Sequence, residues 1–367
     1  MRRAGAGGGL RRRRMMLVIL AVFFAAGCGS DTGGPHPSTL TPRGYVMGFS
    51  SFPPRLDLPS LIANLQMWSS RADAGLFHDS PPWAALLAGT PADSAVRANE
   101  LPIAQYYRSK GFKIVFTVDC TDGLDRSAEA LELVAAGRSI TEPAVQQLYR
   151  EWVAAVDTII KPDWLGLAAE TNLIRAAAPP PVYAALVTMT GAAAAEARAR
   201  DPGRALYVSV QVEVAWGRLS GSGPYVGVDQ DVTDFPFVNA FGLSSYPYLA
   251  GFAAPESLPS NYYSRLVAGR PLPVMVVEGG WSSASVGSVV SSPEMERRYI
   301  VKQAALLDTA RAIGVFQLDF SDLDISGYPP PINPILPLFV SLGLVDVNLK
   351  PKPALSAWDA TFSRPKR

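Results

Sequence analysis

The sequence predicts an α/β protein built as one (β/α)8 barrel, a TIM barrel, and three observations support this prediction. Eight short apolar segments recur along residues 44–367, amphipathic helical stretches separate them, and several segments are apolar on consecutive residues. Parallel strands that helices cover on both faces have this continuous apolar character. About 320 residues hold eight such units within the usual size range of the fold.

The eight predicted strands are short and mostly apolar. The third, KIVFTV, and the seventh, preceded by Pro273, show the continuous apolar pattern most clearly. The predicted strands are residues 45–49, 72–77, 113–118, 164–169, 206–212, 238–243, 274–277 and 315–320.

Helices are predicted to lead into the strands. Before the fourth strand, apolar residues recur at helical spacing from residue 145 to residue 160, after Thr141 and Pro143, whose types suit a helix start. Before the eighth strand, Ser292 opens a predicted helix that runs to about residue 312. The competing fold, a doubly wound open sheet, needs a Gly-rich phosphate turn after its first strand, and residues 48–53 lack this pattern.

The first 27 residues have the regions of an export signal. Six arginines, at positions 2, 3 and 11–14, precede the thirteen-residue apolar run 15–27. A permanent transmembrane helix needs roughly 20 apolar residues, so this run is too short to stay in a bilayer. We therefore expect residues 1–27 to be a signal peptide that is removed during export.

Cys28 follows this run directly, and the sequence Ala-Ala-Gly-Cys resembles the lipobox of bacterial lipoproteins. The resemblance implies that Cys28 is acylated and anchors the exported protein to a bacterial membrane, on its periplasmic or its cell-surface face. An ordinary signal peptide with a chance cysteine is the alternative. Residues 28–43 are rich in Gly, Pro, Ser and Thr, which predicts a flexible tether before the domain 44–367.

Removal of the signal changes the charge balance. Of the 33 basic residues 27 remain, against 32 acidic ones, so the net charge is about −5. This balance argues against nucleic acid as a partner, and the lipid is the only membrane contact we expect of a monomeric protein. With Cys28 acylated, Cys120 has no disulfide partner and is expected to be buried.

Two glutamates follow predicted strands at the end where (β/α)8 barrels carry catalytic residues. Glu170 follows the fourth strand, and Glu278 follows the seventh. Hydrolysis of a glycosidic bond with retention needs an acid that protonates the leaving oxygen and a carboxylate that attacks the anomeric carbon, about 5 to 5.5 Å apart. Strands four and seven face each other across a barrel mouth, so this pair can supply that spacing.

Two segments carry a resemblance to a known family. Residues 273–281, PVMVVEGGW, resemble the nucleophile strand of clan A of the glycoside hydrolases, and residues 241–248, FGLSSYPY, are similar to the sixth strand of its endo-galactanase family. The resemblance implies a retaining glycosidase without cofactor, acting on a β-linked poly- or oligosaccharide. It implies Glu278 as nucleophile, Glu170 as general acid/base, Tyr246 as a hydrogen-bond donor to Glu278, and Trp281 as a sugar contact.

One position departs from the clan pattern. The clan usually has Asn immediately before the acid/base, where it binds the sugar 2-hydroxyl, and this chain has Ala169. Asn172, two residues after Glu170, is the candidate to reach the same hydroxyl. Hydrogen bonds to the 2-hydroxyl contribute several kcal/mol in the transition state. The departure therefore leaves three alternatives open: a slow enzyme, an unusual substrate, or a carbohydrate-binding lipoprotein without catalysis.

Further candidates for the barrel mouth are aromatic and polar residues that follow the other predicted strands. Aromatic faces flanked by carboxylates suit sugar rings, although a Trp in a barrel loop is as often part of the core. The candidates for substrate binding are His78, Trp83, Asp119 and Trp216, with Asp79, Asp122, Glu213, Asp319 and Asp322 as weaker ones.

Other chemistries have less support in the sequence. The chain has two histidines, one of them in the tether, and no cluster with the spacing of metal ligands, so no metal is predicted. An ion at Asp119 and Asp122 would indicate a metal-dependent hydrolase, and products longer than the substrate would indicate a transglycosylase. As purely structural roles, Glu170 would pair with a neighbour such as Arg175, and Glu278 would cap the next helix.

Overall fold

The computed structural model describes residues 40–219, 223–328 and 332–367. The predicted signal peptide, Cys28 and most of the predicted tether lie outside the described residues. Arg43, which the sequence assigned to the tether, belongs to the fold: it is buried, and its Nη1 lies 2.6 Å from Oδ2 of Asp73. The ordered chain therefore includes this residue, because its charge is neutralised by a side chain just before the second strand.

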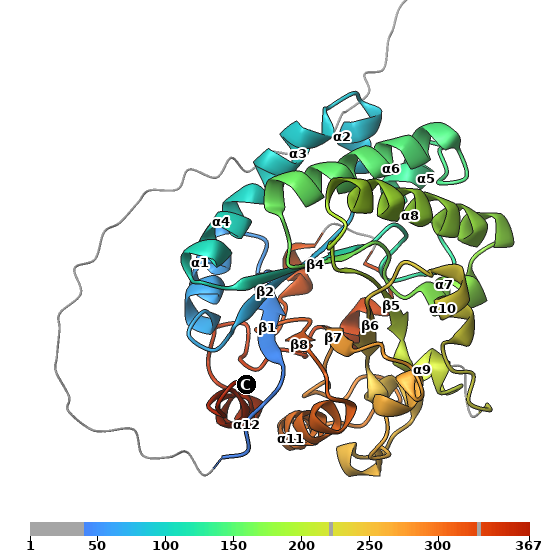
Figure 1. Cartoon of the computed structure of the whole chain (residues 1–367). Coiled ribbons are helices and arrows are strands. Elements are labelled where there is room, and N and C mark those ends of the chain that lie inside the picture. Colours follow the sequence, from blue (N-terminus) through green and yellow to red (C-terminus); the bar gives the residue numbers. More distant parts are fainter. Residues whose placement is uncertain (1–39, 220–222, 329–331) are drawn as a thin grey trace, which may run out of the picture. The chain divides into compact units, whose positions relative to one another are not determined.

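Eight parallel strands form a closed barrel in sequence order, β1 pairing with β8, which confirms the predicted fold (Figure 1). Neighbouring strands are joined by hydrogen bonds throughout, and helices lie outside the ring. The strands are β1 Val46–Ser50, β2 Ala74–Asp79, β3 Lys113–Val118, β4 Trp164–Gly166, β5 Leu206–Gln211, β6 Ala240–Ser245, β7 Val274–Gly279 and β8 Gly314–Gln317.

The helices surround the barrel and also form parts of the loops at its mouth. The α-helices are α1 Leu58–Trp68, α2 Trp83–Leu87, α3 Ala92–Asn99, α4 Leu101–Ser109, α5 Leu131–Ala135, α6 Pro143–Ala155, α7 Thr171–Ala177, α8 Pro180–Arg200, α9 Val212–Ala215, α10 Asp229–Asp234, α11 Pro293–Ala310 and α12 Pro353–Phe362. A π-helix, η1 Val156–Ile160, and the short 3-10 helices η2 Pro247–Ala250, η3 Pro255–Ser257, η4 Ser264–Val267, η5 Ile325–Gly327 and η6 Leu336–Leu338 complete the set.

The predicted helix starts are close to the observed ones. Ser292 caps α11, and its side chain accepts a hydrogen bond from the amide of Met295. The helix before β4 begins at Pro143 with Glu142 as its cap, and its last turn is the π-helix η1. Both helices end at a residue in the left-handed region, Lys161 and Arg311, which turns the chain toward the following strand.

Apolar side chains fill the inside of the barrel, and Tyr207 is the largest of them. Its ring lies so close to two neighbouring strands that a Cβ at Gly166 would come within 2.5 Å of it and one at Gly242 within 2.9 Å. Its hydroxyl lies 2.6 Å from that of Thr117. The interior below the mouth is therefore packed, as in other barrels of this size.

A β-bulge in β7 sets the direction of Glu278. Leu243 pairs with Val276, but Ser244 pairs with Glu278, so Val277 has no partner on β6. Val277 packs in the interior cluster, and strict alternation would turn the next residue toward the helices. A bulge places two successive residues opposite one on the neighbouring strand and re-aims a side chain. Glu278 therefore reaches the mouth directly above Val277.

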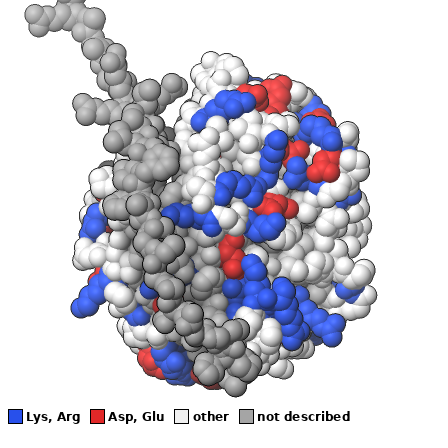
Figure 2. All heavy atoms as spheres, turned by 60° about the vertical axis from the view of Figure 1, so that its left-hand side comes forward, with Lys and Arg blue, Asp and Glu red and all other residues white. Residues whose placement is uncertain are grey.

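Several smaller features agree with the sequence. Cys120 is buried and forms no disulfide among the described residues. No helix in this described part combines the length and the apolar character that crossing a bilayer would need. On the face shown in Figure 2, Lys and Arg lie in groups with Asp and Glu among them. In one group of this kind, Arg108 and Lys113 both form ion pairs with Asp163.

Candidate active site

A pocket of about 650 Å³ opens at the mouth of the barrel. Residues at the ends of β2, β3, β4, β6, β7 and β8 and in the loops that follow them line it. This is the end of the barrel at which (β/α)8 enzymes carry their active sites. The ionisable side chains of its deeper part are His78, Asp79, Asp119, Arg126, Glu170, Tyr246, Glu278 and Asp319.

Glu170 follows β4 in a backbone conformation that is unusual for a residue with a side chain. Its φ is 46°, in the left-handed region, where a non-glycine residue costs about 1 to 2 kcal/mol. The Ser209 hydroxyl on β5 accepts a hydrogen bond from the Glu170 amide at 2.9 Å and holds this turn. Such strained positions occur preferentially at functional sites. The turn directs the Glu170 carboxylate into the pocket.

Ser244 and Arg126 contact the Glu170 carboxylate, and Asp119 contacts the Arg126 guanidinium. Ser244 of β6 donates a hydrogen bond to Oε1 at 2.6 Å, and Nε of Arg126 donates one to Oε2 at 2.8 Å. Arg126 also donates from Nη1 to Asp119 at 2.5 Å. All four side chains are buried. The guanidinium therefore neutralises two carboxylates at once, and it stabilises negative charge on Glu170.

Glu278 has a different environment. The Tyr246 hydroxyl donates a hydrogen bond to Oε1 at 2.8 Å, and Oε2 lies 3.5 Å from Nδ1 of His78. Burial and the negative charge of Glu170 together raise the pKa of Glu278 to about 7. Burial also raises the pKa of Tyr246 far above its usual range, so this phenol remains a donor at neutral pH. Glu278 thus changes its protonation state near neutrality.

His78 connects Glu278 to the other carboxylates. Its Nε2 lies 3.3 Å from Oδ2 of Asp119. Burial alone would lower the pKa of His78, but the charges of Glu278 and Asp119 outweigh it and raise the pKa to about 9. Burial likewise opposes charge on Asp119, yet Arg126 and His78 hold its pKa well below the usual range. An alternating row of charges therefore runs from Glu170 through Arg126, Asp119 and His78 to Glu278.

Asp319, just after β8, is the least compensated acid of the pocket. Neither carboxylate oxygen has a hydrogen-bond partner among the described residues, although the side chain is buried. Burial and repulsion by Asp322 and Glu278 raise its pKa well above the ordinary value. Asp322 itself is paired with Lys352 at 2.8 Å and does not line the pocket.

The structure brings seven of the sequence-predicted site residues into one pocket: Glu170, Glu278, Tyr246, His78 and Asp119, with the weaker candidates Asp79 and Asp319. The hydroxyl of Tyr246 donates to Glu278, as the resemblance implied. Arg175, the expected structural partner of Glu170, instead pairs with Asp231 at 2.8 Å. Arg126 takes that place from the loop after β3. Glu213 is buried below the loops, where the Tyr262 hydroxyl donates to it.

Four predicted substrate contacts do not line the mouth pocket, and their side chains are engaged elsewhere in the fold. Trp281 is buried, and its Nε1 donates to the Ser291 hydroxyl. Trp83 is buried at the start of α2, and Trp216 stacks on Tyr262 with ring centroids 5.2 Å apart. None of the three lines the mouth pocket.

Asn172 is the fourth predicted substrate contact that does not line the pocket. Its amide nitrogen donates to the carbonyl of Gln211 at 2.9 Å, and its Oδ1 accepts from the Gln211 amide at 2.8 Å. Both polar atoms therefore bridge α7 to the end of β5, and the side chain is buried. Asn172 does not replace the asparagine that the clan pattern places before Glu170.

Arg126 and Ser244 were not among the residues predicted from the sequence. Ser244 lies two residues before Tyr246, and alternation along a strand puts both on the same face, so it was open to prediction. Arg126 lies seven residues after Asp119 in a loop, and no periodicity indicates where a loop side chain points. The leucine-rich part of the lining was also not predicted, since its residues come from the separate segments that follow β3, β4, β5, β6 and β8.

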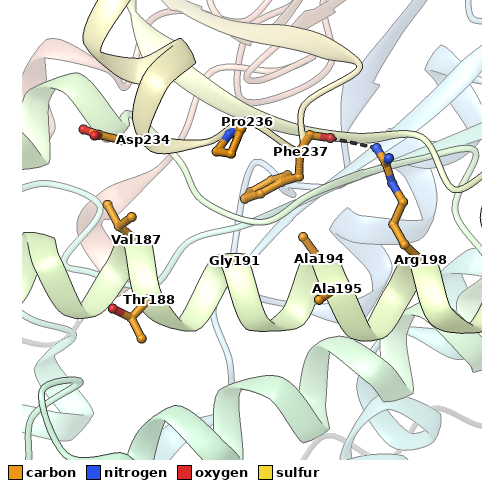
Figure 3. A pocket seen from close by; sticks show the side chains of 9 residues that line it. All are labelled: Val187, Thr188, Gly191, Ala194, Ala195, Arg198, Asp234, Pro236 and Phe237. Carbon is orange, nitrogen blue, oxygen red and sulfur yellow. Dashed lines mark hydrogen bonds between the residues drawn. The ribbon is translucent and has the colours of Figure 1, made fainter.

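Two observations restrict other kinds of site. Within the described ranges, no group of three or more His, Cys, Asp or Glu side chains is arranged to hold a metal ion. A second hollow, of about 450 Å³, lies outside the barrel between α8 and residues 234–237 (Figure 3). There Arg198 donates to the Phe237 carbonyl at 2.7 Å, and Asp234 accepts from the Tyr183 hydroxyl. This hollow has no second carboxylate, so the mouth is the candidate active site.

The fold and the pocket together define a (β/α)8 barrel with two carboxylates at the ends of β4 and β7. No protein-family model and no curated protein matches the sequence. Among solved structures, the fold is similar to an exo-β-1,4-mannosidase from Opitutaceae bacterium strain TAV5, with a TM-score of 0.63 and 16% identity over 89% of this chain. It is also similar to the GH53 catalytic domain of Ignisphaera aggregans, with a TM-score of 0.61 and 15% identity over 90% of this chain.

A third similar structure is a β-glucuronidase from Ruminococcus gnavus, with a TM-score of 0.53 and 16% identity over 87% of this chain. The chain spans 61% of the mannosidase, 50% of the glucuronidase and 100% of the GH53 domain. These structural neighbours are glycoside hydrolases of clan A. At such identities the likeness establishes only that this chain shares the barrel fold of these three structures.

Proposed function

We propose that the protein is a retaining glycoside hydrolase that cleaves a β-linked sugar. The observation that carries this proposal is the pair Glu170 and Glu278, which lie at the ends of β4 and β7 in one pocket and interact electrostatically. The clan A resemblance of strands six and seven and the glycosidase neighbours support it. Catalysis by paired carboxylates needs no metal or cofactor.

In the proposed reaction Glu278 is the nucleophile and Glu170 the general acid/base. Glu278 attacks the anomeric carbon while Glu170 gives its proton to the departing oxygen, and a glycosyl ester forms on Glu278. Glu170 then takes a proton from water, and the water oxygen displaces Glu278 from the sugar. One proton and one water molecule account for both steps, and Glu278 ends as a free carboxylate.

The contacts of the free protein bear on where this proton lies. Arg126 stabilises charge on Glu170, and the raised pKa of Glu278 keeps a proton on that group up to about pH 7. The reactive state needs the opposite distribution. We therefore propose that a bound sugar weakens the contact between Arg126 and Glu170 and so favours transfer of the proton to Glu170. After the proton leaves Glu170, the same contact stabilises the carboxylate.

The direct test is hydrolysis of a panel of p-nitrophenyl β-glycosides of glucose, galactose, mannose and xylose. We expect turnover of at least one, with the β-anomer as the first product in a proton NMR time course. Substitution Glu170→Ala is expected to lower kcat for an unactivated glycoside by about 10² to 10⁴-fold. With a p-nitrophenyl glycoside, whose leaving group departs without a proton, added azide should attack the glycosyl ester on Glu278, restore turnover of this variant and give the β-glycosyl azide. An α-anomer as first product would contradict the retaining mechanism.

A second candidate function is carbohydrate binding without catalysis. Ala169 in place of the clan asparagine and the ion pair between Arg126 and Glu170 favour it. Calorimetry with the same sugars separates the two functions: binding of a substrate that remains intact after days of incubation would support the binding protein. Turnover that Glu278→Gln removes would support the hydrolase.

We also propose that the protein is exported and carried on a membrane by acylated Cys28. The support is the sequence of residues 1–28 alone. In a bacterial expression host, labelled palmitate should be incorporated into the wild-type chain and not into Cys28→Ser. Labelling that persists in the variant would contradict acylation at this residue.

A further inference from the structure

Aliphatic side chains surround the upper part of the mouth pocket. They come from the loops after several strands and are only partly buried, so they present apolar surface to the opening. They include Leu124, Leu173, Ala177, Leu249, Leu336 and Leu338. Exposed apolar groups gathered at one opening are unfavourable in water, and this arrangement is typical of surfaces that bind an apolar group.

Aromatic platforms for sugar rings are scarce in this wall. The chain has seven tryptophans, all within the described residues, and none of them lines the pocket. Among the described residues, the aromatic side chains of the lining are those of Phe52, Tyr246, Tyr328 and Phe339. The hydroxyl of Tyr246 already donates a hydrogen bond to Glu278. A pocket for a chain of sugars needs stacking faces and hydrogen-bonding groups at each ring. Leucines supply neither.

The aliphatic side chains flank the acid/base side in particular. Leu173 lies one helical turn after Glu170 in α7, and its amide donates to the Glu170 carbonyl at 2.9 Å. Ala177 follows one turn later, and Leu124 belongs to the loop that brings Arg126 to Glu170. In the proposed reaction Glu170 protonates the departing oxygen, so the leaving group must lie on this side.

Two polar side chains of the lining on the same side already bind protein partners. Oδ1 of Asp125 accepts hydrogen bonds from the amide of Ser127 at 3.0 Å and from its hydroxyl at 2.5 Å. The amide side chain of Gln211 donates to Glu213 and accepts from the Val214 amide. A second sugar placed here would lose hydration from its hydroxyls without equivalent partners, which costs free energy for each unpaired group.

We infer that the leaving group of the substrate is an apolar aglycone, an alkyl or aryl-alkyl group, rather than a second sugar. The inference rests on the proposed function for the position of the leaving group, and it names the substrate class. The sugar occupies the acidic floor around Glu278, and the aglycone lies against the leucine wall near Glu170.

The test uses 4-alkylphenyl β-glycosides of the sugar that the p-nitrophenyl panel identifies, with methyl, butyl and octyl chains below their micelle concentrations. The phenol keeps the same leaving ability along this series, so only the apolar contact changes. We expect kcat/KM to rise about two- to fourfold for each added methylene until the wall is covered. A phenyl glycoside with an ethylene glycol chain of octyl length is the polar control and should gain little.

Substitution of wall residues should flatten this dependence. Leu173→Asn and Leu124→Asn should each reduce the ratio of kcat/KM for the octyl and methyl compounds. The matched control is Leu131→Asn on α5, because Leu131 is 70% exposed and lies outside the pocket lining. A polar chain or a disaccharide that reacts as well as the octyl compound would overturn the inference.

Binding measurements keep this test separate from the test of catalysis. Calorimetry with the wild-type protein and with Glu278→Gln needs no turnover, and the octyl glycoside should bind at least tenfold more tightly than the methyl glycoside. If no glycoside is cleaved, the series is made with the sugar of the panel that binds most tightly in calorimetry. If the preference then holds and Leu173→Asn reduces it, the hydrolase proposal fails and the apolar wall stands. Equal affinity for the octyl and methyl glycosides would overturn the inference of an apolar aglycone site, whether or not the protein is an enzyme.

Discussion

Glu170 and Glu278 share one pocket, but their surroundings differ in charge. Glu170 accepts hydrogen bonds from a guanidinium and a serine hydroxyl, whereas Glu278 accepts one from a phenol and faces an imidazole at 3.5 Å. Charge on Glu170 is matched by a permanent cation. Charge on Glu278 depends on burial, on His78 and on Glu170 itself.

Position on the barrel therefore does not settle which of the two carboxyl groups carries the proton. In the free protein the neighbours favour charge on Glu170 and a proton on Glu278 near neutrality, while retaining hydrolysis needs the reverse. The negative charge of Glu170 is itself one cause of the raised pKa of Glu278. The experiments below remove one side of this comparison at a time.

The largest effect is expected from Glu278→Gln. Loss of the attacking carboxylate should lower kcat by a factor on the order of 10⁵ or more, with the fold unchanged because the amide fills the same space. Stopped assays with the best aryl glycoside measure the residual rate. Glu294→Gln, on the exposed start of α11, is the control and should retain full activity. A residual rate within tenfold of the wild type would exclude Glu278 as the nucleophile.

Arg126→Gln removes the cation that pairs with Glu170. Removing the cation leaves Glu170 and Asp119 buried and unpaired, which is expected to lower the free energy of unfolding by about 3 to 5 kcal/mol. Urea denaturation followed by circular dichroism measures this loss. Arg297→Gln removes an exposed pair with Glu294 on α11 and should leave the unfolding curve unchanged. Equal curves for both variants would mean that Arg126 does not compensate the two carboxylates.

Tyr246→Phe tests the phenol side. The nucleophile must be ionised, so kcat/KM should fall as the pH drops below about 7, the pKa of Glu278. The Tyr246 hydroxyl stabilises the ionised form and lowers this pKa, so its removal should move the acid limb upward, by about one pH unit. A pH profile of kcat/KM for both proteins measures the shift. Movement to lower pH would contradict the assigned direction of the hydrogen bond.

The smallest effect is expected from Trp216→Phe. The ring packs on Tyr262 away from the pocket, so KM should stay within about twofold of the wild type. Leu173→Asn is the informative comparison, since that residue lines the pocket beside Glu170. A large rise of KM in Trp216→Phe would return this tryptophan to the substrate-binding site.

The sequence allowed the barrel and its two carboxylates to be predicted because both depend on local patterns. Residues 113–118 are apolar enough to fix β3 at its observed bounds, and Glu278 comes directly after four consecutive apolar residues of β7. β4 is shorter than its apolar run, since pairing as a strand ends at Gly166. The tryptophans were misplaced because a large ring near a strand end packs equally well under a loop or in a cleft.

Long-range closure explains the remaining misses. Arg126 reaches Glu170 across 44 positions of sequence, and Ser244 reaches it across 74. Hydrophobic periodicity carries no information about such contacts, which depend on how separate loops meet in space. The same holds for the leucine wall, since each leucine alone reads as an ordinary loop residue.

The bulge in β7 also controls the path of water. Glu278 stands on Val277, and below it Met275, Phe316 and Tyr207 fill the barrel. Because these side chains pack the interior, we expect solvent to reach the carboxylate through the opening that the leaving group would occupy. In the proposed reaction the aglycone therefore blocks the opening of the pocket while it is bound. The glycosyl ester stays dry until the aglycone has left, and the order of bond cleavage and hydrolysis follows from the packing of the barrel.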